Sequence, residues 1–302
     1  MADQKITELD ANTTPASTDL TVIVDDPGGT PATQKMTLDT LDDYLSASSK
    51  TLTNKTLTSP VIQAYGGYMP IGHTCTYASS DDPTYTFTIA GFDATTLLSP
   101  GMKIYLTDSG DQYFFVTKVV FDDPGSTITV YGGTDYDLST GAITNPFYST
   151  EKAPLGFPLS PLKWTVETRD TTQAFQATPT GGTWYNLGSI TIVIPIGIWN
   201  VSYQVVMSGY DNDALNSYVT STLSTANNSE SDADFSGRGF VNKVSTDAAF
   251  MDIEMSFYRF KYLNLATKDT YYLNGKVDNT STHVFFAGDA VPTIIRAVCA
   301  FL

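Results

Sequence analysis

The chain has 302 residues, of which 41% are hydrophobic and only 16% charged, and its 32 acidic against 16 basic side chains give a formal net charge of −16. No apolar run is long enough to cross a bilayer as a helix, since the longest, Ile190 to Trp199, is interrupted by Thr, Pro and Gly. We therefore expect no membrane insertion, and the polar start of the chain predicts no secretory leader. An acidic excess without a Lys/Arg cluster argues against a nucleic-acid partner, because the phosphates would be repelled.

The residue types that replace charge indicate an all-β fold. The chain carries 18 Tyr and 16 Phe beside many Thr and Ser residues, and aromatic and β-branched side chains favour strands. Turn signals and composition divide the chain into four predicted parts: residues 1–45, 46–63, 64–163 and 164–302.

Residues 1–45 predict a hairpin followed by a short helix. A strand is expected at 20–24, a turn at 26–31 and a return strand at 34–38, after which Asp39 is expected to cap a helix that reaches Leu45. A lone hairpin with one helical turn is marginal in water, so this part needs a partner surface. The apolar residues expected to make that contact are Leu20, Val22, Val24, Leu38 and Leu41.

Residues 46–63 contain a short internal repeat. Thr51–Lys55 (TLTNK) is echoed by Thr56–Pro60 (TLTSP), five residues later. Three parallel copies of the chain would place Leu52, Leu57 and Ile62 on a shared axis. On the residues alone, a flexible Ser/Thr linker is an equal alternative.

Residues 64–163 predict a small β-barrel or sandwich. Strands are expected at 85–89, 103–107, 113–120 and 127–131, with a hairpin turn at 108–111. Five or six strands without a long helix are typical of such modules. The segment Pro154–Pro161, with three prolines and a glycine, should hold no regular structure and marks the predicted domain boundary.

Residues 164–302 predict a two-sheet sandwich of jelly-roll type. Its expected strands are 188–195, 197–208, 217–222, 249–263, 270–277, 282–288 and 292–302. The last segment, Ala297–Leu302, is apolar on both faces, and one of these would meet water in an isolated sandwich. We therefore expect a second subunit to cover it, with Phe301 among the contacts.

Several of these stretches resemble parts of tailed-bacteriophage fibre proteins. Lys5–Leu9 with the Thr21–Thr30 strand and turn resembles their N-terminal anchor, and Lys50–Pro60 resembles their short trimeric stalk. The stretches 100–107, 127–138 and 154–158 are similar to a β-barrel module of phage structural proteins. The strand pattern of the last 139 residues suggests the trimeric jelly roll of tumour-necrosis-factor-like and complement-like heads.

The resemblance implies a homotrimeric virion fibre that is assembled in bacterial cytoplasm. Its N-terminus would bind capsid, neck or tail proteins, and its C-terminal head would adhere to a host surface glycan or protein. Two alternatives are a passive capsid or neck decoration protein and a polysaccharide-degrading tailspike. The tailspike reading would rely on Asp252 and Glu254, two carboxylates on one strand face, which are otherwise expected to face solvent.

Motifs for catalysis or metal binding are missing from the sequence. His73 and His283 are far apart in the chain and neither sits in a recognisable motif, so no enzyme activity is predicted. Cys75 and Cys299 are expected as two buried thiols. The oxygen-rich stretches 211–213 and 230–234 leave a calcium site open, but their spacing does not match a calcium loop, and neither metal nor cofactor is predicted.

Polar loops with aromatic residues are the predicted receptor-binding surface, because rings stack on sugars while amides and carboxylates hydrogen-bond to them. Loops on a rigid sandwich commonly carry recognition. The candidate residues are Tyr210, Asp211, Asn212, Asp213, Phe235 and Arg238.

Overall fold

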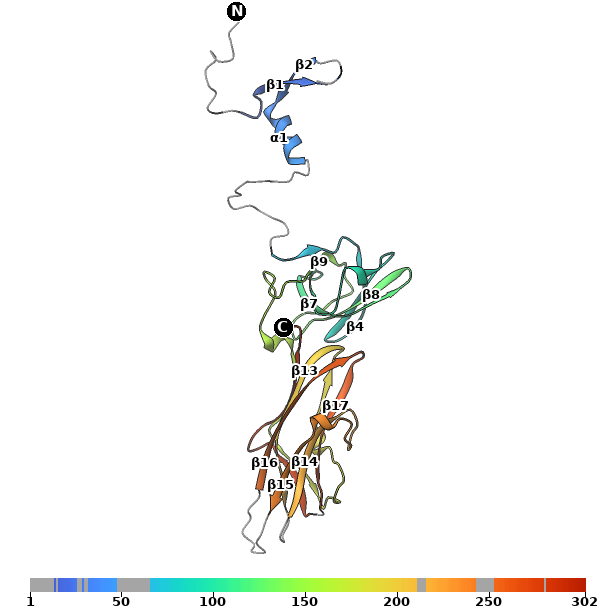
Figure 1. The fold of residues 1–302 in the computed structure, drawn as a ribbon, viewed down its shortest axis with the longest axis vertical. Helices are drawn as coiled ribbons and strands as arrows, with labels where there is room; N and C mark the ends of the chain where they lie inside the picture. The colour runs from blue at the N-terminus through green and yellow to red at the C-terminus, as the bar shows by residue number, and fades with distance from the viewer. Residues whose placement is uncertain are drawn as a thin grey trace, which may run out of the picture. The chain divides into compact units, whose positions relative to one another are not determined.

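The computed structural model describes Thr14, Gly29 and residues 16–25, 32–47, 66–210, 216–242, 253–279 and 281–302. The chain divides into two compact units, Met1–Val61 and Ile62–Leu302 (Figure 1). The predicted stalk contacts Leu52, Leu57 and Ile62 lie outside the described residues, as do Asp211, Asn212, Asp213 and Asp252.

The N-terminal unit contains the predicted hairpin and helix. Strand β1 (Leu20–Asp25) pairs antiparallel with β2 (Ala32–Thr37), and α1 (Leu38–Ala47) follows at once. The helix cap differs from the prediction: Oγ1 of Thr37 accepts a hydrogen bond from the Thr40 amide at 3.1 Å, so Thr37 caps the helix and Asp39 lies in its first turn. In the described part of the chain, no helix has the length and apolarity to cross a membrane.

The second unit begins with a seven-stranded antiparallel sheet that curls around its own core, with strands in the order β3-β9-β6-β7-β8-β5-β4. Alternate side chains of its strands, among them Phe87, Ile104 and Val130, are fully buried in that core. The strands are β3 (Met69–Pro70), β4 (Cys75–Asp81), β5 (Thr84–Ile89), β6 (Lys103–Thr107), β7 (Asp111–Asp122), β8 (Gly125–Tyr131) and β9 (Thr144–Ser149). The four strands expected here are confirmed, and β3, β4 and β9 were not predicted.

Two further sheets form a β-sandwich from residue 165 onward. One has the order β10-β19-β13-β18-β11, with β16 pairing along the other side of β13, and the second has the order β12-β17-β14-β15. The first comprises β10 (Thr165–Asp170), β11 (Gln173–Ala177), β13 (Gly197–Tyr210), β16 (Ile253–Leu265), β18 (His283–Ala287) and β19 (Thr293–Cys299); the second comprises β12 (Thr191–Ile194), β14 (Asn216–Ser224), β15 (Gly237–Asn242) and β17 (Asp269–Val277). The all-β prediction is thereby confirmed.

The curled sheet and the sandwich share one hydrophobic core, so they form a single unit. The segment predicted to be irregular, Pro154–Pro161, holds no helix or strand up to Ser160, but Pro161 begins the 3₁₀ helix η3 (Pro161–Trp164). Phe157 within the segment stacks on Trp164 with ring centroids 5.2 Å apart. Phe115 and Tyr131 of the curled sheet pack against Trp164 and Trp199 of the sandwich, at 4.8 and 4.9 Å between centroids. A cut before Trp164 would therefore expose large aromatic side chains of both parts.

The C-terminal strand is paired along both edges within its own chain, and its expected cover by a second subunit stays a prediction. Strand β19 lies between β10 and β13, and its inward side chains Ile295, Ala297 and Cys299 are buried. The strand ends at Cys299, and the C-terminus lies where the curled sheet meets the sandwich (Figure 1). Phe301 is half-buried there, next to Gly101 and 6.2 Å from the Phe115 ring, so it has neighbours within this chain.

Candidate functional site

The outer face of the β12-β17-β14-β15 sheet carries a compact group of aromatic and charged side chains. Because Val219 and Val277 point into the core, their strand neighbours point outward. The register places Arg238, Thr220 and Lys276 in one row across β15, β14 and β17. In the next row, Phe240 of β15 lies opposite Tyr218 of β14.

Side-chain contacts tie these rows together. The guanidinium of Arg238 lies 3.8 Å from the centre of the Tyr218 ring, and the Tyr218 and Phe240 centroids are 4.9 Å apart. Lys276 Nζ lies 4.7 Å from the centre of a Trp184 ring. Asp278, just after β17, pairs with Arg238 and lies 3.9 Å from Lys276 Nζ. We name the following six residues the β14–β15 patch: Trp184, Tyr218, Arg238, Phe240, Lys276 and Asp278.

The charge of this patch is opposite to that of the whole chain. Two cationic side chains, Arg238 and Lys276, share the single carboxylate of Asp278, whereas the chain has a formal net charge of −16. Tyr218 and Phe240 are 42% and 45% exposed. The patch therefore offers flat apolar rings and an excess of one positive charge to solvent.

A polar atom without a partner lies within the patch. Thr220 sits between Arg238 and Lys276 in the same row and is only 5% exposed. Its Oγ1 is buried and has no hydrogen-bond partner among the residues that the structure describes. Buried polar groups are nearly always paired, so this hydroxyl is a donor and acceptor that a bound molecule could satisfy.

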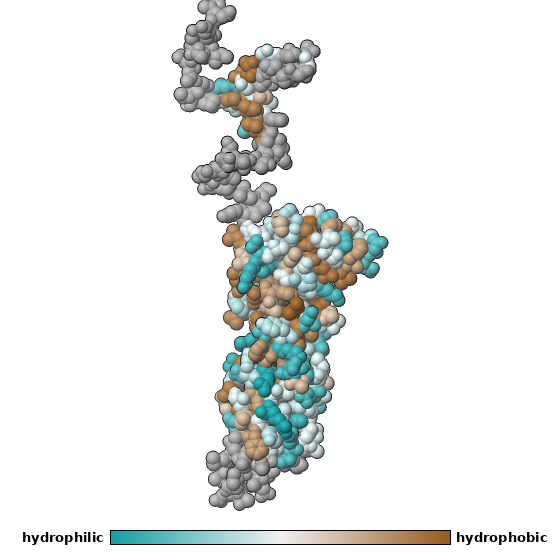
Figure 2. Space-filling model, in the orientation of Figure 1, coloured by the Kyte–Doolittle hydropathy of each residue, from teal (hydrophilic) through white to brown (hydrophobic). Residues whose placement is uncertain are grey.

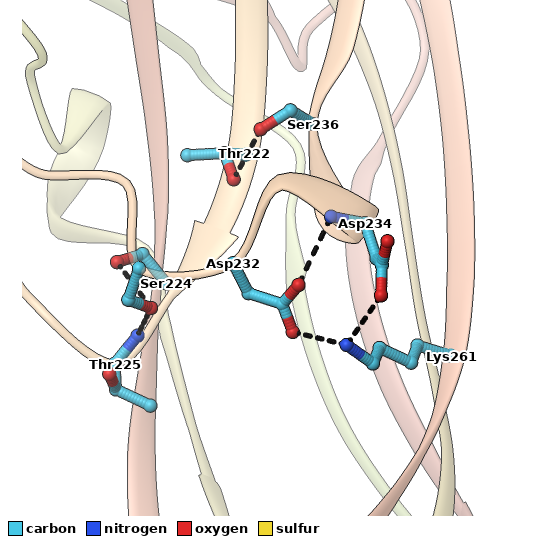
Figure 3. A network of polar contacts seen from close by, with 8 residues as sticks. Thr222, Ser224, Thr225, Asp232, Asp234, Ser236 and Lys261 are labelled. Carbon is cyan, nitrogen blue, oxygen red and sulfur yellow. Dashed lines mark hydrogen bonds and ion pairs between the residues drawn. The ribbon is translucent and has the colours of Figure 1, made fainter.

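The loop that joins β14 to β15 is held by a polar network (Figure 3). Lys261 Nζ reaches from β16 and donates to Asp232 Oδ2 at 2.6 Å and to Asp234 Oδ2 at 2.7 Å. These hydrogen bonds, that to Asp232 first, raise the pKa of Lys261 to about 12. Ser236 Oγ donates to Thr222 Oγ1 at 3.1 Å, which fixes the far end of the loop on β14.

This network bears on the calcium alternative. Lys261 supplies the positive charge for Asp232 and Asp234, the two aspartates of the oxygen-rich stretch 230–234. Within the described ranges, no group of three or more His, Cys, Asp or Glu side chains is placed to hold a metal ion. Asp232 instead caps the short 3₁₀ helix η5 (Ala233–Phe235), accepting from the Asp234 amide at 3.0 Å.

The predicted receptor-binding residues divide into three outcomes. Arg238 lies in the β14–β15 patch, with a half-exposed side chain. Phe235 is wrong as a surface residue: η5 turns its ring into the core, 6.4 Å from Tyr271, and its carbonyl accepts from the Tyr203 hydroxyl at 2.8 Å. Tyr210 ends β13, but its side chain, like residues 211–213, is outside what the structure describes.

The sequence reasoning missed the other patch residues. Tyr218 lies within a predicted strand, at a position where period-two alternation with buried Ser217 and Val219 points it outward. An aromatic residue at an outward position is the signal that could have identified it. The placement of the other patch residues beside Tyr218 depends on strand pairing, which the sequence does not specify; these include Phe240, Lys276 and Trp184.

A second exposed aromatic group lies on the opposite sheet. On β16, Tyr258, Phe260 and Tyr262 occupy alternate outward positions and are 60%, 60% and 64% exposed; we call them the β16 stripe. Their cross-strand partners on β13 are uncharged: Gln204, Ser202 and Asn200. Oδ1 of Asn200 is buried and lacks a hydrogen-bond partner within the described part of the chain.

The predicted anchoring residues are partly exposed. In the N-terminal unit, Leu20 and Val22 of β1 are mostly exposed, while Leu38 and Leu41 of α1 are half-buried. The side chain of Val24 lies outside the description. Figure 2 shows hydrophobic residues, in brown, on the surface of this unit. Such a surface favours contact with another protein.

The remaining chemically reactive groups are dispersed. Cys75 and Cys299 are buried and not bonded to each other, as expected, and burial raises the pKa of each thiol to about 12. His73 stacks on Phe92 at 3.8 Å, and His283 contacts Phe175 at 5.4 Å. Glu254 is exposed on β16. A hollow of about 510 Å³ adjoins His73 and is lined on its other side by Ile143–Phe147.

Comparisons with known proteins give a weak structural likeness. No protein-family model matches the chain, and no curated protein matches it either. Among solved structures, dimeric latent PorU from Porphyromonas gingivalis is similar over 78% of this chain, with 11% sequence identity and a TM-score of 0.27. This chain spans 24% of the length of that one, and a likeness at this level identifies no family.

Proposed function

We propose that this protein is a structural fibre of a bacteriophage virion, anchored by its N-terminal unit and presenting a trimeric C-terminal head for adhesion to a host surface. The observation that carries the proposal is a division of exposed apolar surface between two units. The small N-terminal unit exposes the aliphatic residues Leu20 and Val22, while the sandwich exposes aromatic residues on two opposite faces.

The strand order of the sandwich supports a jelly-roll head. Strands β10, β19, β13 and β16 line one sheet and β12, β17, β14 and β15 the other. The first and last strands, β10 and β19, are neighbours, and from β12 to β17 the chain changes sheet at every step except from β14 to β15, a pattern that two Greek keys can produce. This order fits the trimeric head that the sequence resemblance implies.

The β16 stripe supports self-association of this head. Three exposed rings on one strand, with uncharged cross-strand partners on β13, favour burial against another protein. Copies of a chain with a charge of −16 repel one another, so contact is favoured at a face with little charge. Arg296 and Glu167, which flank this face on β19 and β10, neutralise each other through a hydrogen bond of 2.7 Å.

Trimer assembly leaves the β14–β15 patch free for recognition, because the patch lies on the other sheet. Each head would bind its receptor weakly, and three heads on one fibre would raise the avidity. The Lys50–Pro60 stretch would join the three chains below the heads, and assembly onto capsid, neck or tail would use Leu20 and Val22.

Mass photometry of the full chain tests the assembly, and saturable binding of the labelled chain to a panel of bacterial strains tests adhesion. A trimer that binds a subset of strains is the expected result. A chain that stays monomeric contradicts the trimeric fibre. A trimer that binds no strain contradicts adhesion and favours the passive decoration protein.

A further inference from the structure

We propose that the β14–β15 patch binds a saccharide that carries a carboxylate, such as a uronic or sialic acid residue of a surface polysaccharide. This inference rests on the proposed adhesive function and names the class of receptor. Its elements are the Arg238–Thr220–Lys276 row, which would hold the carboxylate, and the rings of Tyr218, Phe240 and Trp184, which would hold the sugar.

The carboxylate is argued from charge. Arg238 and Lys276 flank Thr220 in one row, and Asp278 satisfies only one of their two positive charges. A planar guanidinium pairs well with a carboxylate through two parallel hydrogen bonds, and an ammonium adds a point charge beside it. The Thr220 hydroxyl, buried without a described partner, supplies a neutral donor at the centre of the row.

The sugar is argued from the exposed rings and their polar surroundings. Aromatic faces pack against the C–H groups of a sugar ring, while nearby charged groups bond its hydroxyls. The Asp278 carboxylate and the Tyr218 hydroxyl lie beside the rings for this purpose. A protein partner is less suited, because a specific protein interface needs about 800 Å² per partner, whereas this patch comprises six residues.

The patch is also already ordered. Arg238 is held against Tyr218 by stacking and against Asp278 by an ion pair, so little side-chain entropy remains to be lost on binding. The neighbouring loop is fastened by Lys261, Asp232 and Asp234. The site is therefore a rigid platform rather than a flexible loop.

The test is a glycan array that is probed with the full chain. The array contains uronate-bearing, sialylated, neutral and phosphorylated saccharides, and the methyl esters of the acidic saccharides serve as matched probes. We expect binding to carboxylate-bearing glycans and loss of it on esterification. Arg238→Ala and Lys276→Ala should each weaken binding about tenfold or more. Lys268→Ala, which removes an exposed cation paired with Asp81, is the charge-matched control and should bind as the unaltered chain does.

Thr220→Val separates a binding role from a structural one. Replacing an unpaired buried hydroxyl by a methyl group should leave the melting temperature equal or raise it, yet should weaken glycan binding. Unchanged affinity in Thr220→Val would remove this hydroxyl from the site. A variant that merely damages the fold would lower both the melting temperature and the affinity for the glycan.

Three results overturn the proposal: no carboxylate-bearing glycan is bound, phosphorylated glycans are bound equally well, or Arg238→Ala leaves binding unchanged. Binding of the labelled chain to bacterial cells is measured in parallel. Cell binding without array binding would refute the ligand class and leave adhesion standing. If the chain binds neither the array nor the cells, adhesion is refuted as well.

Discussion

The two outer faces of the sandwich expose aromatic side chains in different settings. On the β14–β15 patch, Arg238 and Lys276 stack on aromatic rings and share Asp278. On the β16 stripe, Tyr258, Phe260 and Tyr262 have uncharged cross-strand partners and larger exposed fractions. The first setting provides charge and hydrogen-bond groups for a polar ligand, and the second provides apolar area.

The difference shows that exposed aromatic residues alone do not identify a kind of site. A ring with a cation held beside it presents a charged group and an apolar face to a ligand at the same place. A row of rings without such contacts gains most when another protein removes it from water. In the proposed function, accordingly, the β14–β15 patch serves recognition and the β16 stripe serves assembly.

The largest loss of stability is expected from Trp199→Ala, because this substitution damages the core beneath both faces of the sandwich. Trp199 is fully buried on the inner face of β13, its Nε1 donates to the Pro195 carbonyl at 2.8 Å, and its ring packs on Tyr131 of the curled sheet. We expect a loss of about 3–5 kcal/mol in the free energy of unfolding. Chemical denaturation followed by fluorescence and circular dichroism measures it.

The same experiment tests whether the curled sheet and the sandwich unfold together. Because Trp199 contacts both, a single shifted transition is expected, and Trp199→Phe should lose less. Two separate transitions, with only one shifted by the substitution, would mean that the two parts are independent domains.

The second effect concerns assembly through the β16 stripe. If the protein assembles as proposed, the triple variant Tyr258→Ser, Phe260→Ser and Tyr262→Ser should be monomeric where the unaltered chain is trimeric. The melting temperature of the subunit should not fall, since these rings lie outside the core. Mass photometry against concentration measures the change. The matched control is Tyr218→Ser with Phe240→Ser, which removes exposed rings from the other face. A trimer that survives the triple variant but not the control would reverse the assignment of the two faces.

The sequence predicted strands well and surfaces poorly. Period-two alternation located β5, β13 and β19, whereas β15, which contains Gly237 and Gly239, was not among the expected strands. In the folded chain, a Cβ at position 237 would lie 2.8 Å from the Phe257 ring, so the packing of β16 favours glycine there; a Cβ at position 239 would lie 2.7 Å from the end of the Met255 side chain. Whether a glycine-containing segment forms a strand is therefore decided by a packing partner more than ten residues away in the sequence.

The candidate site illustrates the same limit. Phe235 was assigned to the surface because its neighbours are polar, yet η5 turns its ring inward. Arg238 was selected from the sequence, but its stacking on Tyr218 follows from the register of β14 and β15. One-residue shifts of register exchange the two faces of a strand, and local sequence does not fix them.

A smaller effect is expected from Tyr203→Phe, which detaches the loop next to the patch from the core. The Tyr203 hydroxyl is buried and donates to the Phe235 carbonyl at 2.8 Å, which holds η5 in place. Loss of this bond should cost about 1–2 kcal/mol in the free energy of unfolding. Faster amide hydrogen exchange confined to residues 232–238 would accompany it. Uniformly faster exchange over the whole sandwich would contradict a local role.

The smallest effect is expected for the pH dependence of the stability that Lys261 contributes through its ion pairs with Asp232 and Asp234. These pairs link β16, the strand of the β16 stripe, to the loop beside the patch. The hydrogen bonds that Lys261 donates to Asp232 and Asp234 raise its pKa from 10.5 to about 12. A raised pKa in the folded state means that the pair stabilises the fold fully below pH 10.5 and loses that contribution as the pH rises through 12. Because the pair is exposed to solvent, the change should be small.

Thermal melting between pH 9 and pH 12, for the unaltered chain and for Lys261→Gln, measures this contribution. Both proteins should lose stability at high pH, since burial raises the pKa of Tyr203 to about 12 and unfolding lets that phenol ionise at its ordinary pKa. The difference between their melting temperatures should be constant up to about pH 10 and should shrink above it. A difference that stays constant to pH 12 would show that the Lys261 charge does not hold the loop, and that the two faces are not joined through this pair.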